Sequence, residues 1–252
     1  MKRQIATGES LRVMHRIAIL TFLVPRIVIG TAFAGLDEGR NALENGDYST
    51  ALIELQPLAD QNNAEAQVLL GEMYLTGRGT PQDDRQAVAW YRKAAEQGYA
   101  PAQHNLGFSY FNGRGVPQDD RQAVGWYRKA AAQGFAASQN NLGVMYQGGR
   151  GGLPQDDRQA AQWYRKAAEQ GIADALLNLG NLYLNGQGVP RDDVLAYMLF
   201  NLAASSGDKT AASNRTSLAQ RLSPKQIEQA NEFTSRWRPG TPLPTHSDMM
   251  NR

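Results

Sequence analysis

The sequence of 252 residues contains no cysteine. This absence excludes structural disulfides, thiolate metal sites and a lipid-modified cysteine near the amino terminus. Histidine is also scarce, because residues 35–252 hold only His104 and His246. A His-rich metal centre is therefore excluded as well, and we expect neither a metal nor a cofactor.

A strong excess of charge of either sign is also missing. The chain has 26 basic and 24 acidic residues, but five of the basic residues and only one acidic residue lie within residues 1–34. The rest of the chain holds 21 basic and 23 acidic residues. Its charge balance predicts no nucleic-acid partner, since such partners favour clearly basic surfaces.

The amino-terminal segment lacks an apolar run long enough to cross a membrane. The apolar stretch Ile17–Val24 is interrupted by Pro25-Arg26, whereas a membrane span needs about 20 apolar residues. Basic residues come before the stretch, and Ala32-Phe33-Ala34 follows it with the small-x-small pattern of a cleavage site. We therefore expect residues 1–34 to be a secretory signal peptide cleaved after Ala34.

This expectation makes the mature protein periplasmic or secreted, and not embedded in a membrane. An uncleaved membrane anchor is the alternative. Translation from Met1 and translation from Met14 both remain open.

What the sequence does contain is one block of residues repeated at nearly constant spacing. Trp90, Trp126 and Trp163 recur at steps of 36 and 37 residues, a period typical of solenoids built from helix pairs. Within each copy, apolar residues at helical spacing flank a Gly-x-Gly loop. We predict an all-α solenoid of antiparallel helix pairs, with four repeats at residues 64–99, 100–135, 136–172 and 173–208.

The segments around the repeats are less regular. Residues 35–63 are interpreted as a degenerate first helix pair, and residues 209–238 as capping helices that shield the last apolar face of the array. Residues 239–252 contain three prolines and no periodicity. We expect this last segment to be a disordered tail.

Positions that recur in every copy are interpreted as structural. Gly71 lies in mid-helix, where glycine costs about 1 kcal/mol relative to alanine, so we expect a partner helix to pass too close for a Cβ. The recurring Trp-Tyr stripe is assigned to the core. Pairs such as Asp83-Asp84 are adjacent carboxylates, but acid/base catalysis is a weaker explanation than helix capping because the pairs return in each copy.

The block resembles the Sel-one-like repeat, a relative of the tetratricopeptide repeat with a longer loop between its helices. The resemblance rests on the pattern A-x-A-Q-x-x-L-G-x-x-Y-x-x-G-x-G, followed by P-Q-D-D-x-x-A-x-x-W-Y-x-K-A-A-x-x-G. It covers residues 64–207 strongly and 35–63 weakly. It implies a right-handed superhelix with a concave face, and a secreted bacterial adaptor for protein complexes in the envelope or in signalling.

Candidate binding residues come from the first helices of the repeats, which line the concave face in related folds. An Asn row can donate to and accept from the backbone of an extended peptide, although it can equally bond to the next repeat. Slots that differ between copies can encode partner choice. The Asn row consists of Asn105, Asn141 and Asn178, and the further candidates are His104, Asn140, Phe108 and Phe111.

The leading hypothesis is a non-enzymatic scaffold, periplasmic or secreted, whose concave groove binds a peptide or protein partner. One alternative is an envelope enzyme acting on peptidoglycan or β-lactams. The string Ser206-Gly-Asp-Lys209 matches Ser-x-x-Lys, but the other strings of such enzymes are missing, so no catalytic residue is assigned. The second alternative is a glycan-binding module, which would favour exposed aromatic side chains.

Overall fold

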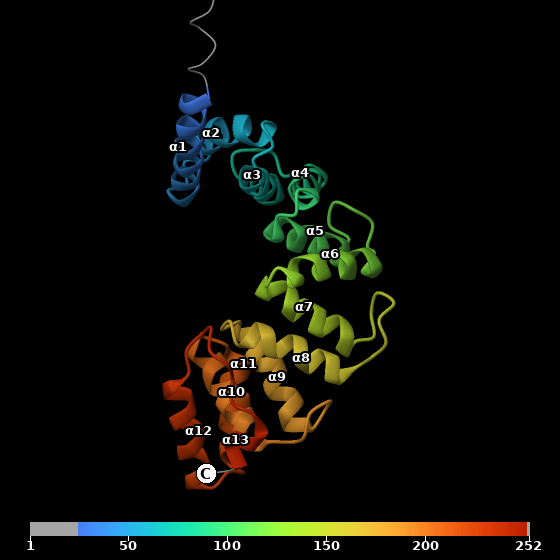
Figure 1. Cartoon of the computed structure of the whole chain (residues 1–252), viewed down its shortest axis with the longest axis vertical. Coiled ribbons are helices and arrows are strands. Elements are labelled where there is room, and N and C mark those ends of the chain that lie inside the picture. Colours follow the sequence, from blue (N-terminus) through green and yellow to red (C-terminus); the bar gives the residue numbers. More distant parts are fainter. Residues whose placement is uncertain (1–24, 251–252) are drawn as a thin grey trace, which may run out of the picture.

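The computed structural model describes the backbone of residues 25–250 and the side chains of residues 35–249 (Figure 1). Within this part of the chain it has thirteen α-helices and no strand, which confirms the predicted all-α class. Most of the expected signal peptide, residues 1–24, lies outside the described residues. The expected cleavage site after Ala34 falls inside the first helix, α1 (Pro25–Glu44).

Successive helices pack against each other along the whole array. Helix α1 pairs with α2 (Tyr48–Asp60) before the repeats begin. The first helices of the repeats are α3 (Ala64–Thr76), α5 (Ala100–Asn112), α7 (Ala136–Gln147) and α9 (Ala173–Asn185). The second helices are α4 (Asp84–Glu96), α6 (Asp120–Ala132), α8 (Asp157–Ala168) and α10 (Asp193–Ser205). The array ends with α11 (Lys209–Ala219), α12 (Pro224–Arg236) and the short α13 (His246–Met250).

The helix pairs follow a curved path, and both ends of the array bend toward the same side (Figure 1). The first helices α3 and α5 contact each other directly, in addition to the helix between them. Such direct contact is expected of helices on the inner side of a curved solenoid. The first helices are therefore the elements that present side chains to the hollow of the curve.

The first aspartate of an Asp pair caps each second helix, which begins at the second aspartate. The carboxylate of Asp83 accepts hydrogen bonds from the backbone amides of Arg85 at 2.9 Å and Gln86 at 3.0 Å. Asp119, Asp156 and Asp192 cap their helices in the same way. A cap of this kind stabilises a helix by about 1 kcal/mol, which confirms capping as the role of these residues.

The mid-helix glycines are explained by the tyrosines opposite them. A Cβ on Gly71 would lie 2.4 Å from the Tyr91 ring, and one on Gly107 would lie 2.8 Å from the Tyr127 ring. Both rings are almost completely buried. The expectation that a partner helix passes close to Gly71 is therefore confirmed, and the ring of that helix takes the space that a side chain would fill.

A chain of amide groups, not foreseen from the sequence, links helices inside the repeats. The buried Gln103 side chain donates to the Ala95 carbonyl at 3.2 Å and accepts from Gln133 at 2.9 Å. Gln67 and Gln139 make the equivalent pairs of bonds. Because a buried amide without partners is costly, these residues have to occur together.

In the first two pairs, the second aspartate contacts the loop of the following repeat. The Arg114 guanidinium lies 3.0 Å from Asp84, and that of Arg150 lies 2.8 Å from Asp120. Each arginine comes 30 residues after its aspartate. The Gly-x-Gly loops are thereby tied to the preceding repeat, and the Asp pairs serve two structural purposes.

The prediction of a disordered tail is wrong for residues 239–249. Leu243 and Met249 are buried, with 3% and 5% of their surface exposed. Arg165 donates to the Leu243 carbonyl at 3.0 Å, and the Leu243 amide donates to Glu169 at 3.1 Å. The segment lacks helical periodicity because it docks mainly as an extended chain, whose backbone groups are satisfied by side chains of the last repeats.

Candidate functional site

The candidate site lies on the first helices of the repeats. We use the name first-helix surface for the positions Leu69, Glu72, Asn105, Phe108 and Asn141. Phe108 stands out because 46% of its surface is exposed, and it is one of two large exposed hydrophobic side chains among the described residues. An exposed phenylalanine gains free energy when a partner covers it.

Phe108 forms one wall of a small hollow that we call the Phe108 pocket. The hollow has a volume of about 90 Å³ and is relatively enclosed. This volume fits a small apolar side chain better than a free ligand of drug size. The lining consists of Phe108, Phe111, Tyr127, Asn141, Val144 and Met145.

The pocket brings together three residues that the sequence analysis singled out, Phe108, Phe111 and Asn141. The Arg150 guanidinium covers the Phe111 ring at 4.3 Å from its centre. Since Arg150 is also held by Asp120, the position of this wall is fixed by the ion pair between repeats. The pocket is therefore a preformed feature of the junction between the second and third repeats.

The Asn row does not act as a single row. Asn105 hydrogen-bonds to Glu72, and Asn141 lies beside the hydroxyl of Tyr127. Asn178 donates to the Asn140 side chain at 3.2 Å, which joins α9 to α7. Each of the three contacts joins two neighbouring repeats, as in the second interpretation of the row, and all three Asn side chains remain partly exposed.

Two further predicted residues are directed into the fold. Asn140 is 8% exposed, and its side-chain oxygen accepts a hydrogen bond from the Asn178 amide. The imidazole of His104 lies 2.9 Å from the Ser138 hydroxyl and packs between the rings of Tyr127 and Phe135. Both side chains join neighbouring helices; Asn140 is buried, whereas His104 remains partly exposed.

Burial changes the pKa of several groups around the site. Burial lowers the pKa of His104 to about 4, so the ring is neutral at pH 7. Burial raises the pKa of Tyr127, and the hydrogen bond to Asn141 opposes this effect. Desolvation raises the pKa of Glu72, which its hydrogen bond to Asn105 partly offsets. Glu72 is the acidic group of the first-helix surface.

The repeat unit itself matches a known family. A model of the Sel1 repeat matches residues 64–99, 100–135, 136–172 and 173–208, which are the four ranges obtained from the spacing of the sequence. These ranges make up more than half of the chain. The chain belongs to the Sel1 repeat family.

Solved Sel1 repeat structures support the assignment. The protective antigen c5321 of uropathogenic Escherichia coli, which displays an SLR fold, is 36% identical, with a TM-score of 0.70. The match covers 76% of this chain but only 42% of that protein. A Sel1 repeat protein from Oxalobacter formigenes is 37% identical, with a TM-score of 0.62, over 71% of this chain and 72% of its own.

A third structure shows the fold alone. It is a putative sel1 repeat protein from Klebsiella pneumoniae, 21% identical with a TM-score of 0.51, over 78% of this chain and 97% of its own. No curated protein matches the chain significantly. Sel1 repeat proteins generally act as scaffolds for protein interactions, which is the coarse function that the family membership supports.

The Ser-x-x-Lys string of this Sel1 repeat protein lies on its surface. Ser206 and Lys209 are both exposed, and no hydrogen bond joins them in the described part of the chain. Within residues 35–249, no three metal-ligating side chains come together. None of the described helices combines the length and the hydrophobicity needed to cross a bilayer.

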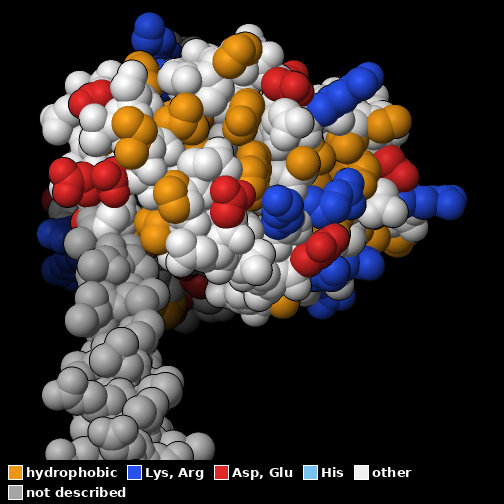
Figure 2. Space-filling model, turned by 90° about the horizontal axis from the view of Figure 1, so that it is seen from above, with side chains coloured by type: hydrophobic (Ala, Val, Ile, Leu, Met, Phe, Trp, Pro, Cys, Tyr) orange, Lys and Arg blue, Asp and Glu red, His pale blue; other side chains and the backbone are white. Residues whose placement is uncertain are grey.

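The surface at the α1 end carries no dominant charge. Figure 2 looks at the molecule from this end and shows acidic, basic and hydrophobic side chains interspersed. A larger hollow of about 610 Å³ lies at the opposite end of the chain, between α12 and the carboxy-terminal segment. Its walls include Phe233, Trp237 and Leu243, so it lies away from the first-helix surface.

Three residues that line the Phe108 pocket were not among the site residues predicted from the sequence. Tyr127 was assigned to the core because it recurs in each copy, although the edge of a core ring can also line a surface hollow. Val144 occupies the same repeat slot as Phe108, so variation at that slot was the available signal. Met145 gave no signal, because three of the four copies have an apolar residue at its slot.

Proposed function

We propose that this protein is a non-enzymatic scaffold that binds a peptide segment or protein domain on the concave side of its array. The observation that carries the proposal is the preformed Phe108 pocket on the first-helix surface. Its exposed phenylalanine and enclosed hollow offer an apolar anchor point. Because helices hold the pocket in place, binding avoids much of the ordering cost that a flexible loop would incur.

The chemistry around the pocket defines the ligand further. Glu72 and Asn105 lie on the neighbouring first helices and present a carboxylate and an amide. Asn141 adds a second amide in the pocket wall. A matching segment is extended, places an apolar side chain against Phe108, and carries a basic side chain toward Glu72. The amides can pair with its backbone.

The location we propose is the periplasm or the outside of the cell. The support is the amino-terminal sequence, which has the charge, the short apolar stretch and the small-x-small pattern of a cleaved signal. After cleavage behind Ala34, helix α1 would begin at Gly35. It would retain Leu36, Gly39 and Ala42, which are the side of the helix buried against the fold.

A capture experiment with a double variant tests the proposal. The full chain with Phe108→Ala and Asn141→Ala is expected to capture at least tenfold less partner from intact cells than the wild type after cross-linking. Its helical circular dichroism signal should stay unchanged, because both side chains are at least partly exposed. Ile53→Ala is the matched control, since Ile53 is exposed on α2. Equal capture by the double variant would refute the binding site.

A further inference from the structure

The carboxy-terminal segment shows how an extended chain binds to a repeat of this protein. We use the name C-terminal strap for residues 239–249. Arg165 donates to the carbonyls of Leu243 at 3.0 Å and Pro244 at 3.3 Å, while Glu169 accepts from the Leu243 amide at 3.1 Å. The strap is therefore held through its backbone at this point, while its Leu243 and Met249 side chains are buried against the fold.

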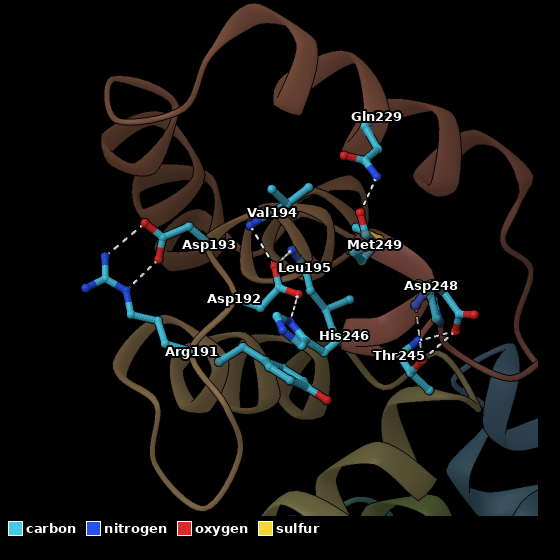
Figure 3. Close-up of polar contacts among 12 residues, drawn as sticks. Arg191, Asp192, Asp193, Val194, Leu195, Gln229, Thr245, His246, Asp248 and Met249 are labelled. Atoms are coloured by element: carbon cyan, nitrogen blue, oxygen red, sulfur yellow. Dashed lines mark hydrogen bonds and ion pairs between the residues drawn. The ribbon is translucent and has the colours of Figure 1, made fainter. Parts of the chain in front are cut away.

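The far end of the strap is fixed at the start of α10. The His246 Nδ1 atom lies 2.7 Å from a carboxylate oxygen of Asp192, the residue that caps this helix. Figure 3 shows the imidazole directed at this carboxylate. Under the strap, Asp192 and Tyr183 are buried, with 7% and 6% of their surface exposed. Arg165 also donates to the Tyr183 hydroxyl at 2.8 Å.

The same four groups occur two repeats earlier in the chain. Arg92 donates to the Tyr110 hydroxyl at 2.8 Å, as Arg165 does to Tyr183. Glu96 and Asp119 occupy the slots of Glu169 and Asp192 and are exposed. We use the name strap-like surface for the four earlier residues. The residues that correspond, from the earlier to the later surface, are Arg92 to Arg165, Glu96 to Glu169, Tyr110 to Tyr183 and Asp119 to Asp192.

Two glycines leave the strap-like surface open. In the later repeat, a Cβ on Gly171 would lie 3.1 Å from Pro239 of the strap, whereas a Cβ on the equivalent Gly98 would meet nothing within 4 Å. Gly125 takes the slot of Met198, which borders the strap, and a Cβ on Gly125 would meet nothing within 4 Å. A helix-interior glycine costs about 1 kcal/mol relative to alanine. No neighbour within the described chain requires glycine at position 125, but a glycine there permits a close approach by a ligand backbone.

The repeat between them provides an internal contrast. Its Arg128 lies farther from Tyr146, at 3.4 Å. Ala132 stands where the other two surfaces have glutamate. The acceptor for a ligand amide is therefore missing in this repeat, and of the two surfaces without a strap only one carries the complete set.

We propose that the strap-like surface binds an extended, proline-containing peptide from a partner protein. Arg92 would donate to its carbonyls, Glu96 would accept from one of its amides, and Asp119 would pair with a histidine or basic side chain. The strap of the same chain stays on its own site, because it follows α12 directly and has a high effective concentration there. This surface shares no residue with the Phe108 pocket, so the two proposals are independent.

A labelled synthetic peptide with the sequence of residues 238–250 tests the proposal on the full chain. Fluorescence anisotropy should report saturable binding of one peptide per chain. Arg92→Gln with Glu96→Gln should weaken this binding at least tenfold. The matched control, Arg165→Gln with Glu169→Gln, alters the strap's own site and should leave the affinity within about twofold. Circular dichroism checks that each variant is folded.

A gain-of-function variant makes the test independent of lost stability. Ala132→Glu completes the set of groups in the middle repeat, so the number of bound peptides should rise from one to two. Absence of saturable binding would overturn the proposal. So would loss of binding in the Arg165/Glu169 control, because the peptide would then only exchange with the strap, and so would a single bound peptide in the Ala132→Glu variant.

Discussion

Two helix-interior glycines in neighbouring helices lie in opposite environments. Gly107 faces Tyr127, and a Cβ there would lie 2.8 Å from the ring, whereas a Cβ on Gly125 would meet nothing. Gly107→Ala should destabilise the protein by about 1–3 kcal/mol through overpacking. Gly125→Ala should stabilise it by about 0.5–1 kcal/mol through helix propensity. Urea unfolding followed by circular dichroism measures both, and equal effects would contradict the assigned packing.

His104 should make stability depend on pH. Its folded-state pKa of about 4 lies below the ordinary value of 6.5, because burial disfavours the charged ring. The contribution of the neutral His104 ring to stability is therefore complete above pH 6.5. As the pH falls from 6.5 toward 4, this contribution is lost, and the free energy of unfolding decreases by up to about 3 kcal/mol.

The matching variant is His104→Gln, which should unfold with a flatter pH dependence over this interval. Thermal unfolding at pH 7, 6, 5 and 4 measures the difference from the wild type. His246→Gln serves as the control and should keep the decline caused by His104. A His104→Gln profile parallel to that of the wild type would show that the imidazole is not desolvated.

The loops between paired helices differ in one position that the family pattern leaves open. Arg114 and Arg150 reach back to Asp84 and Asp120, but the fourth loop has Gln187 at this position. Consistent with this, an oxygen of Asp157 is buried and has no hydrogen-bond partner among the described residues. The fourth repeat therefore lacks the ion pair that ties a loop to the preceding repeat.

Restoring this ion pair should stabilise the array. Gln187→Arg is expected to raise the free energy of unfolding by about 0.5–1 kcal/mol, a modest value because the equivalent pairs are partly exposed. The reverse change Arg114→Gln should lower it by a similar amount. Chemical unfolding in low salt measures both variants, and a destabilised Gln187→Arg protein would argue against the loop register.

The helix pairs could be predicted from the sequence because their signals are local and repeated. Glycine opposite an aromatic ring and aspartate at a helix start each return in every copy. The strap could not be predicted, because Leu243 and Pro244 have no helical period and are held by Arg165, more than 70 residues earlier. Buried glutamines such as Gln103 were missed because a polar residue in a core is recognisable only from its partners.

The candidate site was predicted in part. Phe108, Phe111 and Asn141 do meet in one pocket, since the repeat slots place them on adjacent first helices. His104 and Asn140 are turned into the fold, because a slot that varies between copies can adjust packing as well as partner choice. Variation alone does not distinguish these two roles, and only the side-chain direction does.

The curved array as a whole presents two distinct surfaces, one on the first helices and one over α4, α5 and α6. Photo-cross-linking in living cells tests the central claim that the first-helix surface binds a partner. A photoreactive residue would replace Leu69 on the first-helix surface in one variant and the exposed Arg85 in another. The account predicts a discrete adduct from position 69 alone, and its loss when Phe108→Ala and Asn141→Ala are added. Equal adducts from both positions, or an adduct unaffected by the double change, would contradict it.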